Sequence, residues 1–202
     1  MTGAIIKGTV KLYEKQVIHS AIGQQANSAG RGNGGTFLIR ELPNGSFEPL
    51  LIAGGAGGDD RRKRNPWCNA QLSQYGNGSI VDVNNHNIGS SGTGTVGNYY
   101  NGGSGYALNP PNAKSKYPKC FADGMSGGVY STTLNSGYDG GFGGGGIQHY
   151  NGGGGGFTGG NGTLNWNTSA GGGGSFNIDP NGTATHGWYE PGKCTFRFIK
   201  KL

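Results

Sequence analysis

Residues Gly187 to Cys194 come nearest to a known chemical motif, the phosphate-binding loop of nucleotide-hydrolysing enzymes. They read G-x-x-x-x-G-K-C, so two glycines and a lysine have the required spacing. Cys194 stands where a Ser or Thr hydroxyl would hold magnesium. The residues that follow alternate like a strand, whereas a phosphate-binding loop opens a helix. We therefore predict no nucleotide site at this position.

A second candidate is a calcium loop that begins at Asn177. Asp179, Asn181 and Gly182 follow at the third, fifth and sixth positions of an EF-hand pattern, but Trp188 stands where the bidentate Glu is needed. Asn and Asp also favour turns in which their side chains bond to their own backbone, and that simpler interpretation is preferred. The histidines lack metal-ligand spacing as well. They are His19, His86, His149 and His186. The sequence predicts no catalytic residue, no metal site and no cofactor.

Three cysteines are present, so at least one thiol stays outside any disulfide bond within the chain. None of them forms a C-x-x-C pair or a Cys/His metal pattern. A bridge between Cys68 and Cys120 is the candidate pairing. It would leave Cys194 as a free thiol or as a link to another chain.

The basic residues are unevenly distributed. Arg61, Arg62, Lys63 and Arg64 form one run, whereas the stretch 122–192 contains no Lys or Arg. A nucleic-acid-binding protein would spread its positive charge along a groove, so we predict no nucleic-acid partner. The run is interpreted as a solvated loop, with a patch for an acidic partner or a processing site as the alternative.

Glycine dominates the composition, with 46 of 202 residues, while hydrophobic residues reach 32% and charged residues 13%. Each glycine loses about 0.5–1 kcal/mol more backbone entropy on folding than alanine does. Ordered glycine runs therefore need many hydrogen bonds between segments. Polyglycine II helices provide them, because their outward-pointing backbone groups can bond to close parallel neighbours. The predicted structural polyglycine II residues are Gly143, Gly144, Gly145, Gly146, Gly152, Gly153, Gly154, Gly155, Gly156, Gly171, Gly172, Gly173 and Gly174.

The flanking segments have strand patterns. Residues 9–13 alternate, 16–22 are rich in β-formers, 36–40 and 50–53 read as strands, and Pro43-Asn44-Gly45-Ser46 predicts a hairpin turn between the last two. Residues 193–202 alternate again. We predict one all-β domain over residues 1–202 with essentially no α-helix. Residues 1–53 form strands, 54–175 form loops and the polyglycine II bundle, and 176–202 return as strands.

The order of these features resembles the glycine-rich domain of the anaplastic lymphoma kinase and leukocyte tyrosine kinase receptors. The residues that carry the resemblance are 12–25, 34–40, 49–55, 121–128, 140–146, 152–160 and 171–176. The resemblance implies a small β-sandwich similar to tumour necrosis factor domains, with an inserted polyglycine II bundle and a non-catalytic role in binding protein ligands. The family usually has a further strand-forming segment before this point. We therefore expect a fragment, a truncated sandwich, or edge strands that another chain completes.

These observations favour a non-enzymatic extracellular module that binds a protein ligand. The alternative is a self-assembling structural or adhesive protein, such as a fibre subunit or a viral host-attachment tip, whose partners are copies of itself. A cell-surface or glycan partner is a further alternative, and ice or polysaccharide binding is less favoured because the spacers carry no regular Thr or Ala ladder. The sequence shows no signal peptide and no apolar run that could span a membrane. We expect a location outside the cell or on the surface of a particle.

Overall fold

The computed structural model describes residues 1–26, 30–59, 65–77, 102–106, 118–129, 139–147, 151–163, 169–187 and 190–199. Within these residues the chain is all-β, as predicted. The strands are β1 (Ala4–Lys7), β2 (Ile18–Ala21), β3 (Thr36–Glu41), β4 (Phe47–Ala53), β5 (Phe176–Asn177) and β6 (Thr183–His186). Two short 3-10 helices, η1 (Pro66–Cys68) and η2 (Phe121–Asp123), are the helical elements of the described chain.

The strands form two antiparallel sheets, one with the order β2-β3-β4-β5 and one that pairs β1 with β6. The predicted hairpin joins β3 and β4, with Thr36 opposite Ala53 and Glu41 opposite Phe47. Its turn contains Gly45 at a φ of 77°, a left-handed conformation that glycine adopts without strain. β1 packs against β4 and β5, so the two-stranded sheet covers part of one face of the larger sheet.

An Asx turn after β5 ties the two sheets together. The Asp179 carboxylate accepts hydrogen bonds from the backbone N–H groups of Thr9, at 2.8 Å, and of Asn181, at 2.9 Å. The Asn177 side chain accepts from the Asp179 N–H and donates to the Lys7 carbonyl. The bonds from the Thr9 and Asn181 N–H groups hold the pKa of Asp179 below its usual range. The calcium-like spacing thus serves local backbone bonding, as the preferred interpretation expected.

Two strand predictions are wrong. The first strand is Ala4–Lys7, and residues 8–13 beyond it are not in a strand. The alternation at 193–202 also predicted a strand, yet its described part, 193–199, belongs to neither sheet. The returning strands are β5 and β6, both within 176–187. A strand needs a neighbouring edge as well as an alternating pattern, and the described part of this segment pairs with no strand.

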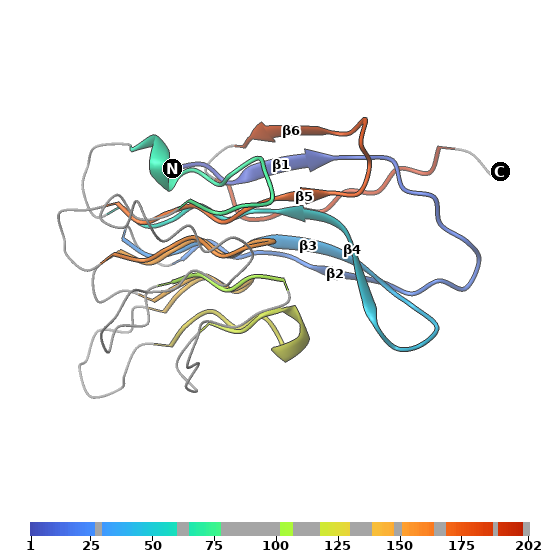
Figure 1. Ribbon diagram of the computed structural model, residues 1–202, viewed down its shortest axis with the longest axis horizontal. Helices are drawn as coiled ribbons and strands as arrows, with labels where there is room; N and C mark the ends of the chain where they lie inside the picture. Colours follow the sequence, from blue (N-terminus) through green and yellow to red (C-terminus); the bar gives the residue numbers. More distant parts are fainter. Residues whose placement is uncertain are drawn as a thin grey trace.

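The glycine-rich segments continue the strands out of the sheet, as Figure 1 shows. Segment 30–35 leads into β3, segment 54–59 leaves β4, and segment 169–175 leads into β5. Segment 151–156 exchanges backbone hydrogen bonds with all three. It does so as well with segments 102–106, 139–147 and 157–163. Segment 151–156 is therefore the hub of a glycine bundle, the name used here for these connected segments.

Hydrogen bonds in the glycine bundle recur at every third residue. Gly152 and Gly155 donate to the carbonyls of Gly30 and Asn33, each at 2.9 Å. Gly55 and Gly58 donate in turn to the carbonyls of Gly155 and Gly152, at 2.8 and 2.7 Å. Two residues three positions apart thus bond to the same neighbouring segment. An extended chain with three residues per turn has this property.

Close backbone approach explains why these positions are glycine. A Cβ atom on Gly34 would overlap the carbonyl oxygen of Phe142, and one on Gly171 would overlap that of Asn77. The obstacles are backbone atoms, which cannot move aside as flexible side chains do. At Gly3, by contrast, the nearest atom would lie at 3.6 Å, an ordinary contact distance.

Buried hydroxyl groups complete the network by bridging a glycine N–H group to a carbonyl group. The Ser175 hydroxyl accepts from the Gly54 N–H at 3.0 Å and donates to the Gln71 carbonyl at 2.6 Å. Thr158 links the Gly76 N–H to the Gln74 carbonyl in the same way. Because a buried backbone group without a partner is costly, each hydroxyl stabilises two segments at once.

We expect Ser175→Ala to lower the free energy of unfolding by about 1–3 kcal/mol, because it leaves the buried Gly54 N–H without this partner. Thermal unfolding followed by circular dichroism measures the loss. Ser73→Ala is the matched control, since Ser73 is exposed and takes part in the network through its backbone carbonyl. Equal stability of the two variants would contradict a structural role for the Ser175 hydroxyl.

The apolar core lies on the face of the larger sheet that β1 does not cover. Phe37, Ile39, Ile52 and Met125 are buried together there, with at most 3% of each residue exposed. Half-buried aromatic rings from η2, β5 and the glycine bundle pack against this core. They are Tyr106, Phe121, Phe142, Phe157 and Phe176. The bundle thus supplies the aromatic layer that a second sheet supplies in a complete sandwich.

Candidate functional site

An aromatic cluster lies where the larger sheet meets the glycine bundle. It consists of His19 on β2, Phe47 on β4, Tyr106 and Phe121 of η2. The rings of His19 and Phe47 meet edge-to-face with centroids 5.4 Å apart, and Phe121 lies 5.3 Å from Phe47 and 5.9 Å from Tyr106. Such contacts between rings are favourable beyond the area they bury. Four separate segments of the chain therefore form one aromatic surface.

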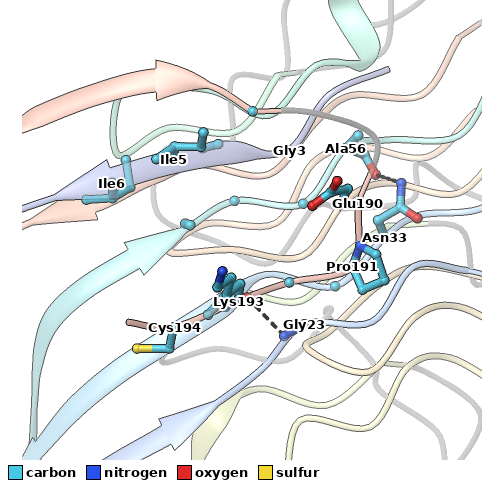
Figure 2. A pocket seen from close by; sticks show the side chains of 18 of the residues that line it. Gly3, Ile5, Ile6, Gly23, Asn33, Ala56, Glu190, Pro191, Lys193 and Cys194 are labelled. Carbon is cyan, nitrogen blue, oxygen red and sulfur yellow. Dashed lines mark hydrogen bonds between the residues drawn. The ribbon is translucent and has the colours of Figure 1, made fainter. Parts of the chain in front are cut away.

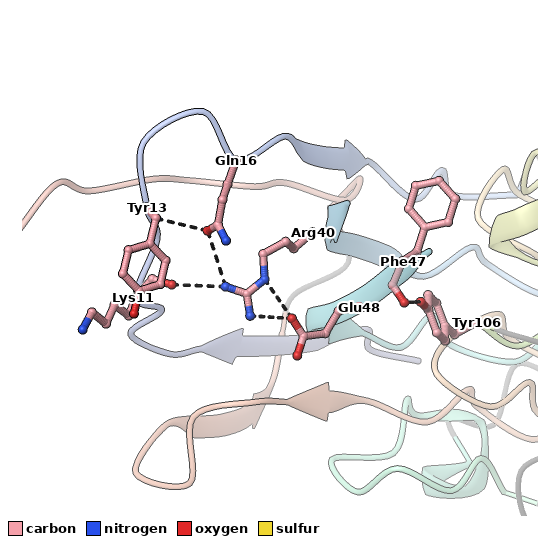
Figure 3. Close-up of polar contacts among 7 residues, drawn as sticks. All are labelled: Lys11, Tyr13, Gln16, Arg40, Phe47, Glu48 and Tyr106. Atoms are coloured by element: carbon pink, nitrogen blue, oxygen red, sulfur yellow. Dashed lines mark hydrogen bonds and ion pairs between the residues drawn. The ribbon is translucent and has the colours of Figure 1, made fainter. Parts of the chain in front are cut away.

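The members of the aromatic cluster are fixed but not covered. Phe47 is 40% exposed, and the His19 side chain is exposed to the same extent. His19 Nε2 lies 2.9 Å from Glu41 Oε2. The Tyr106 hydroxyl donates to the Phe47 carbonyl at 2.9 Å, a contact drawn in Figure 3. Burial raises the pKa of Tyr106, and the negative charge of Glu48 raises it further.

We expect Tyr106→Phe to cost about 0.5–1.5 kcal/mol at neutral pH, because it removes the hydrogen bond to Phe47. An unfolded tyrosine loses its proton near a pKa of about 10. The folded value is higher, so the stability that Tyr106 contributes is complete below the unfolded pKa and is lost as the pH rises through the folded one. The stability difference between wild type and Tyr106→Phe should therefore shrink in alkali. A constant difference across urea titrations from neutral pH to above pH 10 would contradict this.

A polar network around Arg40 lies on the face of β3 and β4 away from the aromatic cluster. It orders the loop between β1 and β2, as Figure 3 shows. The Arg40 guanidinium is paired with the Glu48 carboxylate, with Nε 2.8 Å from Oε2. It also donates to the Lys11 carbonyl and to the Gln16 side chain. The Gln16 side chain accepts from the Tyr13 N–H at 3.0 Å. Tyr13, which is 61% exposed, is thereby held in place outside the aromatic cluster.

A groove of about 650 Å³ lies between the two sheets. Figure 2 shows β1 on one side of it and the chain from Glu190 to Cys194 on the other. Leu38 and Leu51 line it from the larger sheet. The Gly192 N–H donates to the Gly23 carbonyl at 3.1 Å and fixes the second wall. The volume lies within the range of ligand pockets, and the described lining contains polar side chains such as Asn33, Glu190 and Lys193 but no histidine.

The predicted polyglycine II residues all lie in the glycine bundle and are all buried. Most of them donate to another segment, among them Gly146 to Gly153, Gly154 to Gly171 and Gly173 to Gly55. These hydrogen bonds join separate segments, as expected for ordered glycine runs, which need such bonds to offset their loss of backbone entropy. The assignment to polyglycine II geometry itself stays a prediction. The basic run Arg61, Arg62, Lys63 and Arg64 lies outside the described residues.

The predicted bridge between Cys68 and Cys120 is wrong, because both residues are thiols in the structure. They belong to different parts of the molecule. Cys68 ends η1 and its Sγ lies 3.6 Å from the Gly58 carbonyl oxygen, whereas Cys120 precedes η2 and its Sγ lies 3.7 Å from Asp123. Figure 1 shows the two short helices on opposite sides of the glycine bundle. Burial raises the pKa of the Cys120 thiol, which lowers its reactivity.

Other chemistry has little support in the described part of the chain. His, Cys, Asp and Glu side chains there do not gather in threes that could hold a metal ion. The same residues contain no helix with the length and apolar character of a membrane span.

Sequence reasoning missed the aromatic cluster, since its members share no periodicity. Comparison of the chain with protein-family models and with curated proteins finds no match.

Proposed function

We propose that this protein is a non-enzymatic glycine-rich module that binds a protein partner through the aromatic cluster. The observation that carries the proposal is a set of half-exposed rings held in fixed positions at the junction of sheet and bundle. Aromatic residues are enriched at the energetic centres of protein interfaces, where they supply large contact area. Glu41 beside His19 adds a charged group that can orient a partner.

The rigidity of the surroundings supports binding at this place. Tyr106 is fixed by the bond of its N–H to the Phe157 carbonyl and by stacking on the Phe157 ring, with centroids 6.1 Å apart. Phe121 is fixed by the bond of its N–H to the Tyr106 carbonyl. Side chains that are already ordered lose little conformational entropy when a partner binds. The glycine bundle therefore acts as a scaffold that prepares the binding surface.

The proposal includes the finer architecture. Hydrogen bonds that recur at every third residue support polyglycine II helices in the bundle. Two antiparallel sheets support an incomplete sandwich of the tumour necrosis factor type. Both features are implied by the resemblance to the glycine-rich domain of the receptor kinases, whose role is ligand binding. A location outside the cell or on a particle surface is part of the same proposal and rests on that resemblance.

Phe47→Asp tests the function, because it places a charge in the middle of the aromatic cluster. Tyr13→Asp is the matched control, since Tyr13 is also an exposed ring but lies outside the cluster. A photo-crosslinking amino acid at position 47 or 13 identifies what lies against each surface in the protein's native medium. We expect one protein to be crosslinked from position 47 only. Capture of that protein by immobilised variants without the crosslinker should fall at least tenfold with Phe47→Asp and stay at the wild-type level with Tyr13→Asp. Equal capture by both Asp variants would refute the assignment.

A further inference from the structure

The described end of the chain exposes large apolar side chains. Phe196, Phe198 and Ile199 are 62%, 81% and 68% exposed, and we call residues 195–199 the tail. The tail forms no helix or turn and belongs to neither sheet. Alternating aromatic and polar residues on a chain without a strand partner are features of a segment that adds to a sheet.

The groove has the features of an empty strand position. It lies between β1 and residues 190–195, above the Leu38 and Leu51 side chains of the larger sheet. The layer that contains it has only β1 and β6 as described strands, opposite four in the other layer. An extended segment in the groove would run beside β1 and place alternate side chains on the apolar floor.

The tail cannot place both of its aromatic residues in the groove of its own molecule. Residues Glu190 to Thr195 already form one wall, and the tail continues from that wall. To enter the groove it would have to reverse direction, and the shortest hairpin uses about two residues for the turn. A turn at Phe196 and Arg197 would leave Phe196 outside. A tail from another molecule is free of this restriction.

We propose that the tail of one molecule inserts into the groove of a second copy. Both the donor and the acceptor belong to the same chain, so a twofold arrangement lets each copy donate one tail and accept one. The described lining of the groove carries Glu190 together with Lys7 and Lys193, so charge does not select the basic tail. The pairing rests on the exposed apolar side chains and the strand pattern of the tail, and on the Leu38 and Leu51 floor of the groove. The surface used is separate from the aromatic cluster.

The net charge of +6 opposes association of two copies at long range. Added salt screens this repulsion, while the apolar contact between tail and groove is not weakened by it. Dimerisation should therefore strengthen as the salt concentration rises. Association held chiefly by ion pairs would show the opposite dependence.

Light scattering with the full-length protein under reducing conditions tests the proposal, since reduction excludes a disulfide through Cys194. We expect wild type to reach twice the 20.7 kDa chain mass at high concentration. The tail variant F196E/F198E and the groove variant Ala53→Phe should each stay monomeric, with unchanged circular dichroism. An equal mixture of the two should restore a dimer, because the groove variant keeps its tail and the tail variant keeps its groove.

A second measurement covers the case in which Ala53→Phe does not fold. A labelled peptide of residues 195–200 should bind the tail variant, and the F196E/F198E form of the peptide should bind at least tenfold more weakly. Phe47→Asp should leave dimerisation unchanged, which separates this proposal from the function of the aromatic cluster. A monomeric wild type at every concentration, a tail variant that still dimerises, or equal binding of the two peptides would overturn it.

Discussion

Replacing Gly34 with alanine should lower the free energy of unfolding by at least about 3 kcal/mol, the upper end of the usual cost of overpacking. The added methyl group would overlap the carbonyl oxygen of Phe142 and crowd Gly143. Because these obstacles are backbone atoms, relief requires segments 30–35 and 139–147 to separate. The Gly35 bond to the Gly143 carbonyl would then break. A loss of 3 kcal/mol corresponds to a fall in melting temperature of roughly 6–12 °C for a chain of this size.

Gly3→Ala is the matched control for Gly34→Ala. The same methyl group at Gly3 meets its nearest atom at an ordinary 3.6 Å. The change should be close to neutral or slightly stabilising, since alanine has less conformational freedom than glycine in the unfolded chain. Calorimetry on both variants measures the contrast. Similar melting temperatures would show that glycine is not required by close backbone packing at position 34.

Ile52→Ala should cost about 2–5 kcal/mol, the range for truncating a fully buried isoleucine. Ile52 has no exposed surface and packs with Phe37, Ile39 and Met125 between the sheet and the aromatic layer. The bundle cannot collapse into the cavity, because its backbone hydrogen bonds fix its position. We therefore expect a value in the upper half of this range, measured by urea unfolding.

Ile5→Ala is the control for the core prediction. Ile5 lies on β1 and is 38% exposed, so the same truncation should cost no more than about 1 kcal/mol. Equal losses for the two variants would mean that the sheet face under the aromatic layer is not the principal core.

Local patterns predicted the parts of the fold that depend on neighbouring residues. The turn at Asn44 and Gly45 between two strand-like runs identified the β3–β4 hairpin. The glycine runs identified the segments of the bundle, because only glycine permits backbones to approach so closely. The Asx turn at Asp179 could likewise be predicted from the sequence, since its bonds reach Asn177 and Asn181, two residues away on either side.

Features that depend on distant segments could not be predicted. The tail has a good strand pattern, but the sequence does not show which sheet edge lies beside it. Cys68 and Cys120 were paired without knowledge of their positions, and the bundle separates them. The aromatic cluster joins His19 to Tyr106 and Phe121, and no spacing in the sequence relates these residues. Each of these outcomes is decided by how the glycine segments order the intervening chain.

Hydrogen exchange of the hub segment 151–156 tests the central claim most directly, namely that glycine backbones bonded to one another form a rigid bundle. Gly152, Gly154 and Gly155 donate to Gly30, Gly171 and Asn33 from buried positions. Their amides should exchange only through global unfolding, at rates matched by the core amides of β3 and β4. Exchange of these amides at the rate of an unfolded peptide, while β3 and β4 stay protected, would contradict the account.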